Sequence, residues 1–338
     1  MRIVKGADTN TCTDAESSVG TIRVELNAVV MAATERDARV LVVRRPGDAQ
    51  ASLPSGALDP QRDRTLELAL RGWIREQTGL ELGYVEQLYT FGDRDRIPGA
   101  QSAPGTRTLS VAYLALVNQH RPAAGLPAAW RDWYAYFPWE DGRDGPNAVR
   151  ERVLEPALRK WAERGASPAR RRERLERAEI AFGFGRGVWD GERVLERYEL
   201  LYGAGLVDEA HRDAKEPVPR DAAGQGEPLA LDHRRILATA ASRLRGKLKY
   251  RPLVFELLPP TFTFLQLQRV VEALAGTRLH KQNFRRLVAK AGLVEGTGRR
   301  RTDTGGRPAE LFRFRPDVLR ERPAPGVRLP GERAVRGG

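Results

Sequence analysis

The chain has 338 residues, enough for two or three domains with a sizeable core, and its 41% hydrophobic content is ordinary for a globular protein. It contains no apolar run of the roughly 18 residues that a membrane-spanning helix needs. The single cysteine, Cys12, excludes an intrachain disulfide framework or a zinc cluster of cysteines. Because the polar N-terminus also lacks a signal-peptide core, we expect a cytoplasmic protein without membrane contact.

Positive charge is concentrated near the C-terminus. The formal net charge is +13, and residues 243–315 carry 17 lysines and arginines against 5 acidic residues. A general preference for arginine would account for scattered cations, but not for their concentration in one segment. A basic segment beside a near-neutral one predicts a polyanionic partner, most simply nucleic acid.

The N-terminal part alternates between strand and helix patterns. Residues 21–45 predict two strands joined by a polar turn at Thr34–Asp37, and a loop followed by a helix near residues 64–78 comes next. After a further strand segment at 88–96 and a Pro/Gly/Ser loop at 97–105, residues 108–117 predict a buried strand. This order suits an α/β/α sandwich.

Residues 53–80 resemble a Nudix box, whose pattern is Gly, Glu, then Arg-Glu-aliphatic-x-Glu-Glu-x-Gly-aliphatic. The end of the box matches at Ile74, Glu76, Thr78, Gly79 and Leu80, whereas Arg64, Gly72, Trp73 and Gln77 stand where the Arg and Glu residues of the box belong. Nudix hydrolysis needs several carboxylates on one helix face to hold Mg²⁺ against a pyrophosphate. We therefore predict no catalytic residue, no bound metal and no required cofactor, but a pocket that binds a nucleotide diphosphate without cleaving it.

The middle of the chain is predominantly helical. The aromatic run at 130–142 is expected to cover the sheet edge or a pocket mouth, and residues 146–165 and 171–205 predict an inserted helical segment. Residues 212–228 are rich in Pro and Gly and predict a linker. A helix over residues 232–250 follows, and we expect it to join the two functional parts of the chain, with a rotation of this helix as one way to couple them.

The C-terminal segment has the pattern of a winged helix. Thr263 and Gln266 form a capping-box signature for a helix that ends at Gly276, and a second helix is predicted over 280–294. Its outer face carries side chains suited to a DNA major groove: Lys281, Gln282, Arg285, Arg286 and Lys290. Residues 296–314 predict a hairpin, and Arg299, Arg300 and Arg301 beside its turn suit phosphates or a minor groove.

Several long strings in the same order resemble the NrtR family of Nudix-related transcriptional regulators of NAD metabolism. They are residues 86–96, 109–117, 243–250, 255–274, 283–287 and 306–314. The resemblance implies an N-terminal Nudix-like sandwich that binds ADP-ribose or a relative, and a winged helix-turn-helix that binds double-stranded operator DNA as a homodimer. It further implies that the effector releases the DNA, so that the protein acts as a repressor.

The resemblance also places candidate effector contacts. It puts Tyr89, Phe91, Asp93 and Arg96 at the pocket, where an aromatic ring can stack on adenine and an arginine can pair with phosphate. Two further candidates are Arg44, as a phosphate contact at the end of the second strand, and Glu76, as an acid of the pocket or surface. Neither His233 nor His280 is expected to hold a metal.

We predict six segments in the chain. They are a disordered tail (1–20), a Nudix-like effector domain (21–145), a helical insertion with linker (146–228), a connecting helix (229–250), a winged-helix domain (251–316) and a second disordered tail (317–338). Two alternatives stay open: an active hydrolase of ADP-ribose-like nucleotides, in which Glu67 and Glu76 share a helix face and act with Asp93, and an architectural nucleic-acid binder without an effector.

Overall fold

A computed structural model describes residues 21–92, 106–118, 125–185, 187–219, 226–302 and 308–327. Its strands are β1 (Thr21–Ala33), β2 (Ala38–Val43), β3 (Ser55–Ala57), β4 (Tyr84–Phe91), β5 (Thr106–Leu116), β6 (Ala128–Asp132), β7 (Val294–Arg301) and β8 (Ala309–Phe314). Its α-helices are α1 (Leu66–Thr78), α2 (Glu155–Glu163), α3 (Pro168–Phe182), α4 (Val194–Gly203), α5 (Asp208–Ala214), α6 (His233–Leu248), α7 (Phe264–Ala275), α8 (Lys281–Ala291) and α9 (Val318–Glu321). In the described ranges no helix is both long and apolar enough to cross a membrane.

The N-terminal strands form one mixed sheet in the order β4-β5-β1-β2-β6, with β3 paired to β1. β1 runs parallel to β5 and antiparallel to β2 and β3. The turn between β1 and β2 is closed by Thr34, whose hydroxyl accepts a hydrogen bond of 2.9 Å from the Asp37 amide. The strands predicted from residues 21–45 and 108–117 are therefore confirmed.

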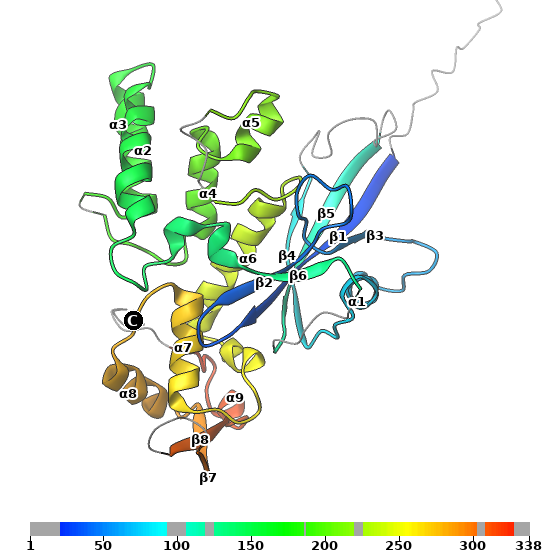
Figure 1. The fold of residues 1–338 in the computed structure, drawn as a ribbon, viewed down its shortest axis with the longest axis vertical. Coiled ribbons are helices and arrows are strands. Elements are labelled where there is room, and N and C mark those ends of the chain that lie inside the picture. Colours follow the sequence, from blue (N-terminus) through cyan, green and yellow to red (C-terminus); the bar gives the residue numbers. More distant parts are fainter. Residues whose placement is uncertain are drawn as a thin grey trace, which may run out of the picture.

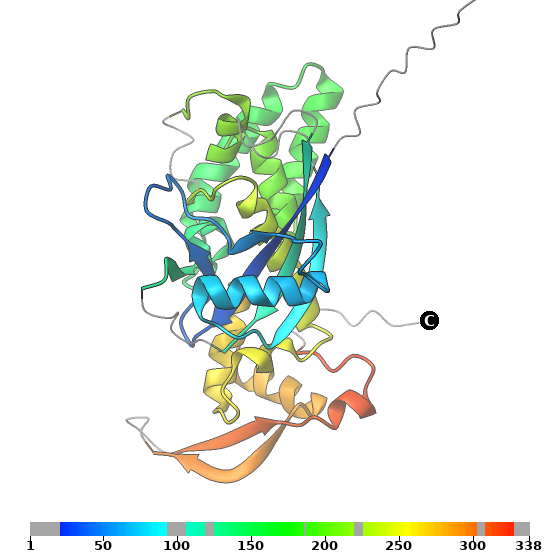
Figure 2. The same cartoon turned by 90° about the vertical axis from the view of Figure 1, so that its right-hand side faces the viewer.

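The two faces of this sheet bury two separate sets of side chains, because successive residues of a strand point to opposite sides. Leu26, Ala28 and Val30 pack with α1 in one cluster, whereas Val29 and Met31 join a larger cluster that includes α6. Figure 2 shows α1 in front of the sheet and the green inserted helices behind it. The α/β/α sandwich predicted from the sequence is thus confirmed.

The helical character predicted for the middle of the chain is found: α2 and α4 lie inside the predicted ranges 146–165 and 171–205, and α3 begins before the second range, at Pro168. The aromatic run before these helices lies differently from expectation. Residues 128–132 are the edge strand β6, but Trp133, Phe137 and Trp139 are at most 2% exposed in the core between the sheet and the inserted helices. At a pocket mouth these rings would be exposed to solvent. Burial removes their large apolar surface from water and is therefore more favourable in free energy. The helix α5 at 208–214 reaches into the predicted linker.

The C-terminal winged helix is confirmed element by element. Thr263 and Gln266 close the predicted capping box at the start of α7, and Gly276 ends that helix with a φ of 69°. α8 follows, and β7 pairs antiparallel with β8 to form the wing. Figure 1 shows this unit at the lower end of the molecule, with the α2–α3 hairpin at the other end.

The segment after the wing differs from the predicted disordered tail at 317–338. Within it, residues 318–321 form α9, Val318 is 0% exposed and Val327 is 1% exposed. The composition suggested disorder, but Val318 and Val327 are buried and Gly326 lies against the backbone of Lys249 and Tyr250, contacts that the local sequence does not reveal. Residues 328–338, like the tail at 1–20, lie outside the described residues.

Candidate functional site

The outer face of α8 is the clearest candidate nucleic-acid interface. Its five predicted contact residues are all exposed: Lys281, Gln282, Arg285, Arg286 and Lys290. The opposite face is fixed by Phe284 and Val288, which are 0% and 1% exposed. Among the residues that the structure describes, no cation of α8 forms an ion pair with an acid, so these charges remain available for phosphates.

The turn that leads into α8 is held by Glu272 of α7. Its buried carboxylate accepts hydrogen bonds from the Leu279 amide at 3.0 Å and from Arg278 at 3.2 Å. Burial raises the pKa of Glu272, but these hydrogen bonds, with others from Gln268 and Arg269, outweigh it and leave the pKa below its usual value. The charged carboxylate therefore sets the angle at which α8 leaves α7.

Aromatic packing joins α7 to the wing. The rings of Phe264 and Phe312 meet edge to face with centroids 4.6 Å apart, and the Arg285 guanidinium lies 5.6 Å from the Phe264 ring. In β7, Arg299 and Arg300 are exposed and Arg301 is partly buried, whereas the wing turn at 303–307 lies outside the described residues. The predicted helix and wing contacts thus lie on one small domain.

Two of the candidate effector residues, Tyr89 and Phe91, are in contact but differ in exposure. Tyr89 and Phe91 lie on the edge strand β4 with ring centroids 5.3 Å apart, and Tyr89 is 62% exposed whereas Phe91 is 6% exposed. A register shift between Gln87 and Thr90 places one extra residue in β4 here, which turns Tyr89 outward. Phe91 belongs to the cluster on the α6 side. Asp93 and Arg96 lie outside the described residues.

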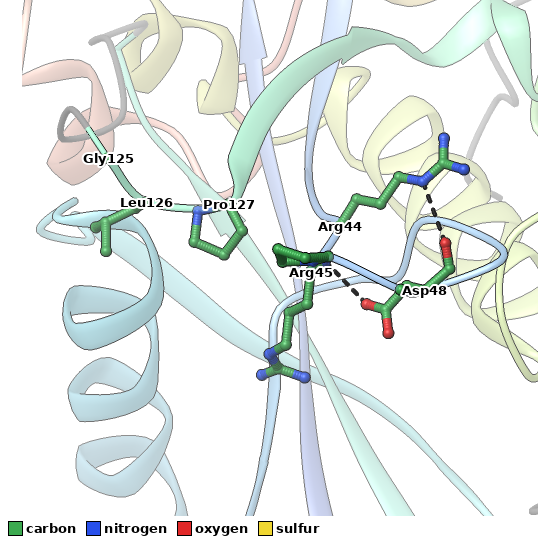
Figure 3. A pocket seen from close by; sticks show the side chains of 8 residues that line it. Arg44, Arg45, Asp48, Gly125, Leu126 and Pro127 are labelled. Carbon is green, nitrogen blue, oxygen red and sulfur yellow. Dashed lines mark hydrogen bonds between the residues drawn. The ribbon is translucent and has the colours of Figure 1, made fainter.

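Arg44 lies in an open pocket of about 670 Å³ at the end of β2. The pocket is lined by Arg44, Arg45, Pro46, Gly47, Asp48, Gly125, Leu126 and Pro127. The Arg44 guanidinium donates to the carbonyl of Asp48 at 3.4 Å, and Figure 3 shows Arg44 and Arg45 pointing to opposite sides of the strand. Of the other effector candidates that the structure describes, Glu76, Tyr89 and Phe91 do not line this pocket.

The acids of α1 are not arranged for metal catalysis. Glu67 and Glu76 are both exposed, but their separation of nine positions corresponds to about 2.5 helical turns, so they point to opposite sides. The expectation that they share a helix face was therefore wrong. Glu67 also pairs with Arg71 at 2.9 Å. Within the described part of the chain, no three His, Cys, Asp or Glu side chains gather as a metal site.

Gln77 and Trp73, at two of the positions that the sequence analysis compares with acidic residues of the box, contact the neighbouring strand β3. The Gln77 amide donates to the Ser55 carbonyl at 2.6 Å, and the Trp73 ring lies so close to Gly56 that an added Cβ there would overlap it. These two side chains thus hold α1 against β3.

A polar cluster on the α6 side of the sheet was not anticipated from the sequence. Asn27 of β1 and Ser110 of β5 are both 0% exposed and are hydrogen-bonded to each other, and Thr108 is 9% exposed on the same face. The Asn27 carbonyl oxygen is buried and has no hydrogen-bond partner among the described residues. An unsatisfied buried acceptor is costly, so it is suited to a donor from a ligand or water. Phe91 lies on this face as well.

The winged helix is tied to the rest of the chain by the buried carboxylate of Glu140. It accepts from Arg197 of α4 at 2.5 and 2.9 Å and from Arg245 of α6 at 2.5 Å. Arg245 also donates to the Leu274 carbonyl in the last turn of α7 at 2.9 Å. The insertion, the connecting helix and the winged helix therefore meet at one buried charge cluster.

A second contact joins the last turn of α6 to strand β4. The Lys247 ammonium lies 2.6 Å from Glu86, whose carboxylate also accepts from the Tyr84 hydroxyl at 2.6 Å. Burial raises the pKa of Glu86, but hydrogen bonds from Lys247 and Tyr84 outweigh it and lower the pKa below its usual value. This pair links the strand that carries Tyr89 and Phe91 to the helix that holds the winged helix.

We expect Lys247→Met to lower the free energy of unfolding at neutral pH by about 1 kcal/mol. Since the folded pKa of Glu86 is depressed, its stabilisation is present above the unfolded pKa and is lost as the pH falls through the folded value. The difference between variant and wild type should therefore shrink below about pH 4.5 in urea unfolding followed by circular dichroism. If the difference stays constant down to about pH 3, roughly one unit below the usual carboxyl pKa, the ion pair of Lys247 and Glu86 does not provide this stabilisation.

Comparison with known proteins matches these features. Residues 254–314 match the family model described as the NrtR DNA-binding winged helix domain. A curated relative, the ADPR-responsive transcriptional repressor NtrR of Acinetobacter baylyi, is 42% identical over 86 residues, which are 25% of this chain and 34% of that protein. The matched segment thus spans about a third of the length of that relative.

Two solved structures resemble the whole fold. NrtR of Shewanella oneidensis, crystallised with a 27mer DNA, is 24% identical, with a TM-score of 0.50 over 88% of this chain and 95% of that chain. A MutT/nudix family protein of Enterococcus faecalis is 17% identical, with a TM-score of 0.50 over 87% of this chain and 88% of that chain. At this identity the likeness shows the fold, a Nudix-type domain followed by a winged helix.

Proposed function

We propose that this chain, whose residues 254–314 match the NrtR DNA-binding winged helix domain, is a DNA-binding transcriptional repressor of NAD metabolism genes. The observation that carries the proposal is the outer face of α8, with four exposed cations that no acid of the described residues neutralises, beside a basic wing. A helix of this length and charge enters a major groove, and arginines of a wing reach the neighbouring phosphates. Such a protein acts in the cytoplasm, where its operator DNA lies.

We infer that the effector is ADP-ribose or a related nucleotide bound by the Nudix-like domain. Support comes from the curated relative, which responds to ADPR, and from the sheet face that carries Phe91, Asn27 and Ser110. Phe91 and Tyr89 offer aromatic rings to a base, and Asn27 offers an unsatisfied acceptor to a ribose hydroxyl or an amine. We further propose that two copies of the chain bind one operator as a homodimer.

We propose that the protein is not an enzyme. Gly72, Trp73 and Gln77 replace residues that a Nudix hydrolase uses, and Glu67 is occupied by Arg71. The alternative of an active hydrolase predicts Mg²⁺-dependent release of AMP from ADP-ribose that Glu76→Gln abolishes. Our proposal predicts no such release by the wild type, so the same assay separates the two.

The proposal is tested by a gel-shift with DNA from upstream of the protein's own gene and of neighbouring NAD-biosynthesis genes, with and without ADP-ribose. Specific binding that ADP-ribose dissolves would support the repressor and its effector together. Specific binding that is unaffected by ADP-ribose would reject this effector class, and sequence-independent binding would favour an architectural protein. Absence of binding at low salt would reject the proposed function.

Tyr89→Ala should raise the concentration of ADP-ribose that releases the operator about tenfold, because one base–aromatic contact contributes on the order of 1–3 kcal/mol. Operator affinity without effector should not change, since Tyr89 is 62% exposed and lies on β4 of the N-terminal sheet, outside the winged helix. Leu68→Ala, at a side chain of α1 that is 55% exposed on the other side of the sheet, is the control. Equal release by both variants would remove Tyr89 from the effector site.

A further inference from the structure

We propose that Arg315, Arg322 and the segment Pro325–Val327, named here the C-terminal strap, position the recognition helix α8 against the end of α6. The strap begins directly after β8 and turns back toward the body of the molecule, as the red segment in Figure 2 shows. The inference rests on the proposed function for its DNA readout, but the contacts that carry it stand on their own.

One end of the strap holds the C-terminus of α8. The Arg315 side chain donates to the Gly292 carbonyl at 2.9 Å, and its backbone amide donates to the Leu293 carbonyl at 3.0 Å. Gly292 ends α8 with a φ of 61°, and a Cβ there would lie 3.1 Å from the Arg315 guanidinium. The cation therefore occupies the negative end of the helix, where the last carbonyls have no partner within the helix.

One acidic and one basic side chain, Glu321 and Arg322, hold this end of the strap in place. The Glu321 carboxylate of α9 accepts hydrogen bonds from the two terminal guanidinium nitrogens of Arg315, at 2.7 and 2.6 Å. This bidentate pair orients the guanidinium. Arg322 donates to the Lys290 carbonyl in the last turn of α8 at 3.2 Å. Val318, which lies between Arg315 and Arg322 in the sequence, is 0% exposed and anchors α9 in the core.

The other end of the strap closes on α6. The Val327 amide donates to the Leu248 carbonyl at 2.7 Å, and Val327 is 1% exposed. Gly326 lies so close to the backbone of Lys249 and Tyr250 that a Cβ on it would overlap their atoms. The strap thus contacts the junction at which the chain leaves α6 for the winged helix.

The recognition helix needs such support because packing alone holds it weakly. Of its 11 residues, Phe284 and Val288 are the buried ones. Contacts at its two ends therefore fix its orientation, Glu272 at the beginning and the strap at the end. Base contacts in a groove require side chains placed to a fraction of an ångström, so a loosened C-terminus should cost operator affinity.

The test is Gly326→Ala in the full-length protein, where the methyl group must push the strap off the α6 junction. We expect operator affinity to fall about tenfold, which corresponds to about 1.4 kcal/mol. Hydrogen exchange should become faster at the amides of 281–291 and 248–251, while ADP-ribose affinity is unchanged. Gly72→Ala on α1, where an added Cβ meets nothing within 4 Å, is the matched control.

Wild-type operator affinity together with wild-type exchange in α8 would overturn the strap. If Gly326→Ala fails to fold, Glu321→Gln removes the charged partner of Arg315 with little change of shape and should speed exchange in the last turn of α8. If the wild type binds no operator, the proposed function fails, and the exchange measurement still decides whether the strap positions α8.

Discussion

Glu140→Gln is expected to lower the free energy of unfolding by about 3–5 kcal/mol, the cost of breaking a buried ion pair from one side. The carboxylate is 2% exposed and is the acid that both Arg197 and Arg245 contact. The amide keeps the shape but leaves two buried guanidinium groups with one neutral acceptor between them. Denaturant unfolding followed by fluorescence of the buried Trp133 and Trp139 measures the loss.

The control for this prediction is Glu173→Gln, which removes an acid that pairs with Arg170 on the exposed surface of α3. We expect no measurable change there, because solvent screens an exposed pair. Replacing Glu140, Arg197 and Arg245 together with apolar residues of similar volume should recover much of the stability. If Glu140→Gln unfolds with the same midpoint denaturant concentration as the wild type, this cluster is not the junction of the inserted helices, α6 and the winged helix.

The second large effect is expected from Arg285→Ala combined with Arg286→Ala, which should weaken operator binding about 100-fold or more. Each arginine is exposed on the outer face of α8, and each contact to a base or phosphate contributes on the order of 1–3 kcal/mol. The slope of log affinity against log salt should also become shallower by about 2, since two fewer counterions are released. Fluorescence anisotropy with labelled operator at several salt concentrations measures both quantities.

The matched control is Arg172→Ala with Arg177→Ala, which removes the same charge from exposed positions of α3. That helix lies at the end of the molecule opposite the winged helix (Figure 1), so affinity and salt slope should stay near the wild-type values. If both double variants lose affinity equally, net charge governs binding and α8 does not read the operator.

Much of the winged helix could be predicted because its signals are local. Thr263 and Gln266 are three residues apart, and the period of Phe284 and Val288 lies within one helix, so neighbours in the sequence are also partners in space. The sandwich was predictable for the same reason, from strand alternation that is visible within a few residues.

The candidate effector residues were less predictable, because they meet through the topology of the sheet. Asn27 and Ser110 come from β1 and β5, which are neighbours only after a crossover, and their pairing depends on the register of two parallel strands. The family resemblance pointed to Tyr89 and Phe91. The bulge that leaves Tyr89 exposed and Phe91 buried, however, depends on how β4 pairs with β5.

By itself, the sequence determined which side chains the chain can offer: Trp73 and Gln77 beside Glu76 on the first helix, a basic second helix in the winged helix, and the caps of that domain. These depend on residue identity and on short spacings. The tertiary structure alone decided which charged side chains are buried in ion pairs and which remain exposed to solvent. Arg245 looks like Arg285 in the sequence, yet the first is 4% exposed against Glu140 and the second lies on the surface. The physical reason is that desolvation and pairing of an ion depend on neighbours 105 residues away, which local periodicity does not encode.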